Sequence, residues 1–452
     1  MMVATIPMYA WIRSGKRTVP MTALVCIFFG VYAGFGAITQ PNSIRILNVD
    51  YELSWESINK AVMLSFLGIA TLVLTLMVLG RFGWVPRSSI DLRVDPRRRI
   101  LSVFTIAGLA LVFRFLASSG WLPLGGHVQL SQVLLLLSSV LAAVFYYRVG
   151  DASSAMKIGL AVLLVYISSV GLTTGMLEAA FLPLVAVLIV RCAVKRQLPV
   201  MLTIVGLLGV FMVNTAKHDY RNRVWYGDED SGTAQKLAVW QESTARIDFR
   251  AFFLGTTLAN DKTITWRESI GRFSIVARLA WVCQNTPSRI PYLAGDSYKP
   301  FIYAPIPRLI WPDKPIFSDV LTQVDQTYGF VGSSVTAAFG IGYIGESYAN
   351  YGVTGVFVIM VLQGLLLFFL DSVFNGPFSE GGVAIFVVLL VAMLNGVGSA
   401  LIIIYGNILQ MAITCALVVF PFTVRAPFVG SRPDRRLFNS PLPSLSNRPR
   451  VG

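Results

Sequence analysis

The sequence predicts an all-α polytopic integral membrane protein with about ten transmembrane helices, within a range of about nine to twelve. Three observations lead to this fold class. The chain of 452 residues is 55% hydrophobic and only 13% charged. Ten apolar runs of about 16 to 22 residues follow one another, and about 20 residues are needed to cross the hydrocarbon core of a bilayer. If these runs are treated as membrane spans, most basic residues of the connecting segments fall on one side of the membrane.

The apolar runs divide into a group of seven, a long interruption and a group of three. We expect the spans near residues 21–39, 60–80, 100–118, 129–147, 156–172, 174–190, 199–214, 353–371, 382–397 and 400–421. The predicted organisation is a seven-helix membrane bundle (1–214), a large periplasmic segment (215–352), a three-helix membrane part (353–421) and a basic cytoplasmic tail (422–452).

The net charge of +14 follows the topology and does not indicate nucleic-acid binding. With the N-terminus in the cytoplasm, the basic clusters at 13–17, 81–99, 148–157 and 191–196 and the tail all fall on that face. The connections 119–128 and 171–175 on the other face carry no Lys or Arg. Both termini are therefore expected in the cytoplasm, and segment 215–352 faces outward.

Segment 215–352 is too long for a passive connection, so function is expected there. Its acidic and basic residues almost balance, and stretches such as RFSIVARLAWVC (272–283) are typical of helices that lie in the interface or pack on the bundle. The chain holds only two histidines, His127 and His218, and no HExxH, serine-elbow or phosphate-binding Gly-rich pattern. Neither a metal nor a cofactor is expected, and an ATP-driven pump is disfavoured.

Arginine beside aromatic residues is abundant, and a planar guanidinium suits a phosphate or pyrophosphate ligand. Arg246 and Arg250 are four residues apart and would share a helix face, either around an anion or reaching to lipid headgroups. Arg272 has Glu268 one turn before it as a possible surface partner, whereas Arg278 has none and is the better ligand candidate. Arg114 lies within the third run, where it faces either the bundle interior or the interface.

The stretch PIPRLIWPDKP (305–315), here called the strap, is too proline-rich for a helix and too apolar for an ordinary solvent loop. Its prolines preset the backbone that presents Arg308 and Lys314. Trp311 can anchor the strap at the interface or stack on a sugar. The alternative is a stiff loop whose charges are simply solvated.

The stretch GYIGESYANYG (342–352) places Glu346 among Gly and Tyr just before the eighth run. A carboxylate there could serve as a general base, with His218 as a rival. Alternatively, Glu346 is a structural acid paired with an arginine.

The stretch 278–355 resembles the Wzy-type O-antigen polymerases, which assemble bacterial surface polysaccharides from oligosaccharide repeat units. The likeness rests on a Pro-Arg-x-x-Trp-Pro-x-Lys-Pro pattern and a Gly-Glu-x-Tyr-x-Asn pattern. Elsewhere it is only topological. The matching residues are Pro307, Arg308, Trp311, Pro312, Lys314 and Pro315 in the first, and Gly345, Glu346, Tyr348 and Asn350 in the second.

The resemblance implies a GT-C-like membrane glycosyltransferase of the bacterial inner membrane, active at its periplasmic face without a nucleotide sugar or metal. It would transfer a growing glycan from undecaprenyl pyrophosphate to a new lipid-linked repeat unit, with a flippase and a chain-length regulator as candidate partners. Arg278, Arg308 and Lys314 would contact pyrophosphate, and Glu346 would act as base. Substrate-binding roles are expected for Arg114, His218, Arg246, Arg250, Arg272, Trp311 and Tyr348.

Two other readings stay open. An O-antigen ligase would use the same donor with a lipid A core acceptor. A polysaccharide or lipid exporter would carry charged groups through many spans, whereas only Arg114 lies deep in a run here.

Overall fold

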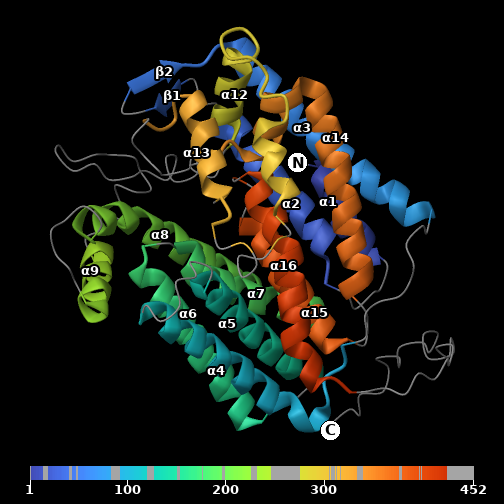
Figure 1. The fold of residues 1–452 in the computed structure, drawn as a ribbon, viewed down its shortest axis with the longest axis vertical. Helices are drawn as coiled ribbons and strands as arrows, with labels where there is room; N and C mark the ends of the chain where they lie inside the picture. Colours follow the sequence, from blue (N-terminus) through green and yellow to red (C-terminus); the bar gives the residue numbers. More distant parts are fainter. Residues whose placement is uncertain are drawn as a thin grey trace, which may run out of the picture.

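The computed structural model describes residues 2–13, 19–39, 43–46, 49–82, 92–119, 127–149, 153–175, 177–195, 199–224, 232–245, 275–304, 306, 311, 313–315, 317–332, 340–375, 379–395, 398 and 400–424. Figure 1 shows their arrangement. The helices are α1 (Met2–Arg13), α2 (Met21–Thr39), α3 (Trp55–Phe82), α4 (Arg99–Ser118), α5 (His127–Val144), α6 (Ser154–Thr173), α7 (Leu177–Lys195), α8 (Val200–Val224), α9 (Thr233–Ala245), α12 (Val276–Asn285), α13 (Phe317–Thr327), α14 (Gly342–Phe374), α15 (Glu380–Asn395) and α16 (Leu401–Val419). Short helical turns are η1 (Pro96–Arg98), η2 (Phe145–Val149), η3 (Asp296–Ile302) and η4 (Phe420–Phe422), and strands β1 (Ser43–Ile46) and β2 (Val49–Glu52) form an antiparallel hairpin.

The prediction of a helical membrane protein is confirmed. Each of the ten apolar runs coincides with a described helix. By length and composition, five helical stretches can cross a membrane, and they are Trp55–Arg81, Pro96–Leu116, Leu130–Val149, Ser154–Thr173 and Gly342–Phe374. Shorter apolar helices lie at Met21–Gly34, Glu380–Leu394 and Ile408–Phe422. The number of ten spans stays a prediction.

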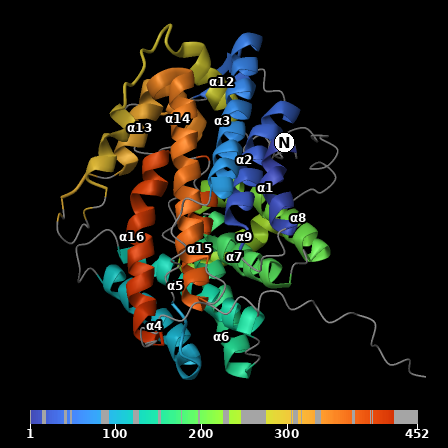
Figure 2. The same cartoon turned by 90° about the vertical axis from the view of Figure 1, so that its right-hand side faces the viewer.

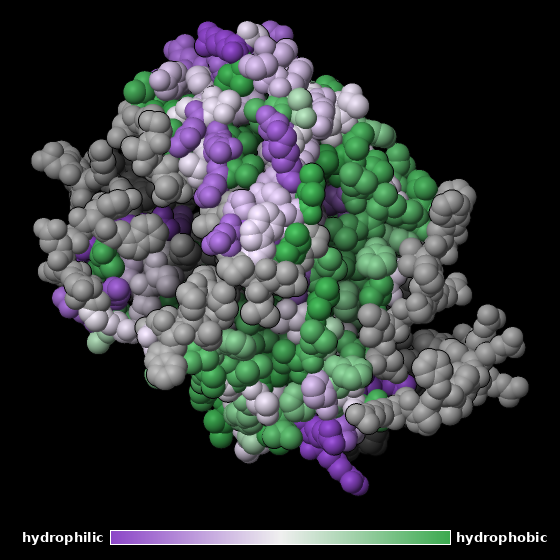
Figure 3. Space-filling model, viewed as in Figure 1, coloured by the Kyte–Doolittle hydropathy of each residue, from purple (hydrophilic) through white to green (hydrophobic). Residues whose placement is uncertain are grey.

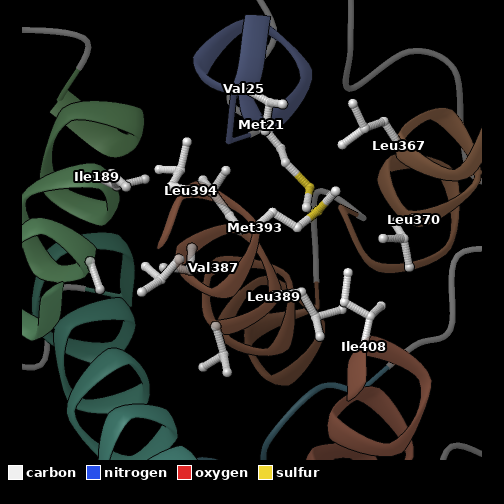
Figure 4. Packing of buried hydrophobic residues seen from close by; sticks show 14 of the residues in the cluster. Met21, Val25, Ile189, Leu367, Leu370, Val387, Leu389, Met393, Leu394 and Ile408 are labelled. Atoms are coloured by element: carbon white, nitrogen blue, oxygen red, sulfur yellow. The ribbon is translucent and has the colours of Figure 1, made fainter. Parts of the chain in front are cut away.

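Two groups of helices meet at α15. Figures 1 and 2 show α1–α3 and α12–α14 in one group and α4–α9 in the other. Helix α15 packs against α5 and α7 of the second group, α2 and α14 of the first, and α16. Its residues are apolar on every side, as expected for a helix enclosed by other helices. Figure 4 shows Met393 and Leu389 of α15 between Met21 of α2, Leu370 of α14 and Ile408 of α16.

We expect Leu389→Ala to destabilise the protein by about 2 to 5 kcal/mol, because Leu389 is fully buried and its loss leaves a cavity at the junction of the two groups. Leu409→Ala is the matched control, since Leu409 is 52% exposed on the neighbouring helix α16. Thermal unfolding of both variants in the same detergent measures the difference. Equal midpoints would contradict a central role for α15.

Several helix ends that the sequence assigns to the cytoplasm contact one another. Asn375, after α14, exchanges two hydrogen bonds with the backbone of Val19, just before α2. Ser379 caps α15 by accepting from the Gly382 amide at 3.0 Å, and it also accepts from the amide of Leu92. A β-bridge joins Val94, before α4, to Thr423, after α16. These contacts join the start of α2, the segment before α4, the connection from α14 to α15 and the end of α16. The orientation of the spans stays a prediction.

Helix α9 is held against the turn between α6 and α7. The Tyr220 ring of α8 stacks on the Trp240 ring of α9, with centroids 4.4 Å apart. The Tyr220 hydroxyl donates to the Thr173 carbonyl, and the Trp240 indole N–H donates to the Leu172 carbonyl. Because both aromatic groups satisfy their polar atoms on α6, segment 215–352 begins as a packed extension of the bundle.

Candidate functional site

The Gly-Glu-x-Tyr-x-Asn pattern forms the first part of α14, before a break in that helix. Every residue from Gly342 to Asn350 is buried. The helical dihedral angles are interrupted at Tyr351 and Gly352, and Gly352 has φ 64°, a conformation that glycine adopts without strain. Helix α14 therefore consists of a short buried segment, here called the α14 cap (Gly342–Asn350), and a long apolar part.

The carboxylate of Glu346 lies at the centre of this cap and is 1% exposed. Its Oε1 accepts a hydrogen bond from Ser297 Oγ at 2.7 Å, and its Oε2 accepts from the Leu401 amide at 2.8 Å. Leu401 is the first residue of α16, so the carboxylate meets the positive end of that helix dipole. These contacts hold η3 and α16 against the α14 cap.

Asn350, one turn after Glu346, uses both ends of its amide. The nitrogen donates to Ser297 Oγ and to the Glu346 carbonyl, both at 2.8 Å, and the oxygen accepts from the Gly295 amide at 2.9 Å. The Leu293 amide also donates to the Ala349 carbonyl. The loop before η3 is thus fixed to the end of the α14 cap.

Arg278 of α12 lies at the start of the cap. Its Nη1 donates to the Gly340 carbonyl at 2.7 Å, and the Gly340 amide donates to Asp325 Oδ2 at 3.1 Å. Burial lowers the pKa of Arg278 from its ordinary value, whereas the nearby negative charge of Asp325 acts in the opposite direction. The ordinary value is so high that the guanidinium stays charged.

Lys314 of the strap is buried and bonded to the backbone. Its Nζ donates to the carbonyls of Ala304 and Ile306, both at 2.9 Å. Gln410 of α16 donates to the same Ala304 carbonyl. Trp311 is 40% exposed, and its ring packs on Tyr303. In this arrangement Lys314 is bound to the backbone at Ala304 and Ile306, and Trp311 is partly exposed.

Lys60, which was not among the predicted site residues, contacts the cap from α3. Its Nζ lies 4.9 Å from the ring centroid of Tyr348, whose hydroxyl donates to the Thr286 carbonyl. In the part of the chain that the structure describes, no carboxylate forms an ion pair with Lys60. A lysine at the first position of an apolar run was the signal that could have identified it.

Two cavities adjoin the cap. A small one of about 10 Å³, enough for about one water molecule, is lined by Glu346, Asp325 and Ser297, among others. A larger one of about 510 Å³, here called the tyrosine groove, lies at the break in α14. It is lined by Tyr292, Tyr298, Asn350, Tyr351, Val358 and Ile359, among others.

The predicted site residues are brought together only in part. Glu346, Tyr348 and Arg278 all lie at the α14 cap. Lys314 of the strap is linked to α16, because it shares the Ala304 carbonyl with Gln410. Arg114 is half-buried on α4, which packs on α5 and α6 and away from the cap in Figures 1 and 2. Arg246, Arg250, Arg272, Arg308 and the side chain of His218 lie outside the described residues.

Comparison with known proteins identifies a family. Neither a curated protein nor a solved structure matches this chain. A family model described as a domain of unknown function, DUF8712, matches residues 21–425. This match includes all ten predicted spans and the α14 cap, so the chain belongs to the DUF8712 family.

Proposed function

We propose that this protein is a GT-C-like glycosyltransferase that polymerises lipid-linked oligosaccharide repeat units at the outer face of the bacterial inner membrane. The observation that carries this proposal is the assembly at the α14 cap. Glu346, Tyr348 and Asn350 of one pattern lie there beside Arg278 and Lys60, next to a groove large enough for sugar rings. Such groups suit a transfer from a lipid pyrophosphate, because cations can stabilise the leaving group and a carboxylate can accept a proton.

The proposed reaction forms one bond and breaks another. An acceptor hydroxyl oxygen of the new repeat unit bonds to the anomeric carbon of the growing glycan, while the bond from that carbon to the pyrophosphate oxygen breaks. The hydroxyl proton leaves to a base, and the electron pair of the broken bond stays on the pyrophosphate. Fixed cations stabilise the charge that grows there, each by about 3 kcal/mol in a water-poor site.

Arg278 and Lys60 are described cations suited to that task. Arg308 of the strap lies outside the described residues, and its contact with the pyrophosphate stays a prediction from the sequence. Lys314 supports it indirectly, because its ammonium is committed to the Ala304 and Ile306 carbonyls. Glu346 is the proposed base. Both of its oxygens accept a hydrogen bond, yet each retains a further lone pair, and Glu346 lines the small cavity of about 10 Å³.

The test is incubation of the purified full chain in liposomes with polyprenyl-pyrophosphate-linked repeat units, followed by mass analysis. We expect glycans of two or more repeat units on the polyprenyl carrier, without added nucleotide sugar. Transfer only to lipid A core would identify a ligase. Movement of substrate across the bilayer without new bonds would identify an exporter. Either result would reject polymerisation.

A further inference from the structure

A second group of cations lies where α5, α7 and α15 meet, away from the α14 cap. These cations are carried by η2, which directly follows α5, and by the last turns of α7, against which η2 packs. Helix α15 packs on both α5 and α7, and it begins at Glu380, just after the end of α14. The apolar part of α14 that separates Glu380 from the cap is roughly 30 Å long, at about 1.5 Å per residue. A ligand in this region is therefore remote from the cap.

The wide π-helical turn η2 carries Tyr147 and Arg148 side by side. Turns of this kind are rare and occur often at functional sites. Lys195 Nζ of α7 lies 5.8 Å from the ring centroid of Tyr147, and the positive charge of Arg191 acts on the same tyrosine. Arg191 and Lys195 are four residues apart, so they share one face of α7. Arg148, Arg191 and Lys195 are thus gathered around Tyr147 and are here called the η2 cluster.

The guanidinium groups at η2 are not satisfied by the protein. The Nη1 atoms of Arg148 and Arg191 are buried, and neither has a hydrogen-bond partner in the part of the chain that the structure describes. The same holds for Nε of Arg99 on α4, whose guanidinium lies over the Phe145 ring of η2. A buried charged donor without an acceptor is costly, so such groups are normally paired. Three such atoms around one turn indicate an anion with several acceptor oxygens.

The carboxylate of Glu380 does not neutralise the η2 cluster. Its charge acts on Arg148, but its Oε2 accepts from the Val94 amide at 3.3 Å. Among the described residues, no carboxylate forms an ion pair with Arg148, Arg191 or Lys195. The cluster therefore keeps an excess of positive charge for a ligand.

The η2 cluster lies where lipid phosphates are found. The candidate span Leu130–Val149 ends within η2, so Arg148 lies at the boundary of an apolar stretch. Figure 3 shows hydrophobic residues over the middle of the molecule and hydrophilic residues toward its ends. The sequence assigns this boundary to the cytoplasm, and basic pockets between membrane helices on that side bind anionic lipid headgroups. A phosphate also matches the guanidinium, which can donate two parallel hydrogen bonds to it.

We propose that the η2 cluster binds one phosphate group, supplied by the headgroup of an anionic lipid or by a soluble phosphate compound. Arg148 and Arg191 donate to the phosphate oxygens from η2 and α7. Lys195 is exposed and adds its charge from the solvent side. The position at the end of a span favours the lipid as the source. This site does not depend on the proposed function.

The test is the ligand-dependent rise in the thermal unfolding midpoint of the full chain in a neutral detergent. Phosphatidylglycerol, phosphatidylcholine and inorganic phosphate are titrated separately. We expect a saturable rise with phosphatidylglycerol and a smaller one with phosphatidylcholine, whose choline cation the cluster repels. Arg148→Gln and Arg191→Gln should each need at least about tenfold more phosphatidylglycerol for the same rise, because a charge-assisted hydrogen bond is lost. Arg81→Gln is the matched control, since Arg81 is an exposed arginine at the end of α3.

Arg191→Gln keeps the test decisive if Arg148→Gln, which leaves Glu380 without its nearby cation, fails to fold. Without ligand, Arg191→Gln should unfold no earlier than the wild type, because it removes a buried donor that has no partner. A wild-type response of this variant to phosphatidylglycerol would overturn the inference. An equal loss in Arg81→Gln, or an equal rise with phosphatidylcholine, would overturn it too. A rise with inorganic phosphate that Arg191→Gln abolishes would support the site and identify a soluble compound as the source.

Discussion

Replacing Glu346 with glutamine is expected to lower glycan transfer by at least about a hundredfold while the protein remains folded. The amide has the same shape, so its oxygen can accept from the Leu401 amide and its nitrogen can donate to Ser297 Oγ. The negative charge and the capacity to take a proton are lost, and general acid–base catalysis contributes about 10² to 10⁴ in rate. The measurement is the initial rate of polymer formation in liposomes, with thermal unfolding as the check on folding.

Glu346→Ala separates the structural role of this carboxylate from its proposed role as base. Alanine leaves the Ser297 hydroxyl and the Leu401 amide without their acceptor, at a cost of about 1 to 3 kcal/mol for each buried group. We therefore expect the alanine variant to lose both stability and transfer. If the glutamine variant polymerises at the wild-type rate while the alanine variant unfolds, Glu346 is a cap for α16 and not the base.

The helices could be predicted because their signal is local. A run such as that of α15 is apolar over about the thickness of a bilayer, and neighbouring residues alone determine this. The buried start of α14 could not be placed in this way. Segment Gly342–Asn350 is helical and buried, η3 and α16 are hydrogen-bonded to it, and no apolar run marks its beginning. The α14 helix accordingly starts well before the predicted run 353–371.

The sequence indicated which residue types belong to the candidate site, but not which groups those residues would contact. Glu346 and Arg278 were identified as candidates, yet the groups that bind Glu346 are 49 and 55 residues away in sequence. The strap indicated a rigid loop carrying cations, but nothing in its residues shows that the Lys314 ammonium binds the backbone carbonyls of Ala304 and Ile306. Lys60 and Tyr348 come from two different apolar helices. Such pairings depend on how helices pack, which a single sequence does not specify.

Replacing Arg278 with alanine is expected to abolish transfer and to destabilise the region around the α14 cap. The guanidinium donates to the Gly340 carbonyl just before α14, and Asp325 holds the amide of the same residue. Removal of a buried charge beside an opposite one is strongly destabilising, by about 3 to 5 kcal/mol. Loss of a cation from the transition state would add about a hundredfold decrease in rate. Arg278→Lys keeps the positive charge but loses the planar guanidinium, which can donate two parallel hydrogen bonds. We therefore expect this variant to fold and to transfer glycan at a reduced rate.

A double variant distinguishes the two effects of Arg278. Asp325→Asn removes the negative charge that Arg278→Gln would leave in a buried place, since Asp325 is 0% exposed. We expect the double variant Arg278→Gln with Asp325→Asn to recover much of the thermal stability lost by Arg278→Gln, because no uncompensated charge remains. Transfer should not recover, because the pyrophosphate still lacks its cation. Recovery of transfer together with stability would mean that Arg278 supports the fold of the α14 cap and has no direct contact with the leaving group.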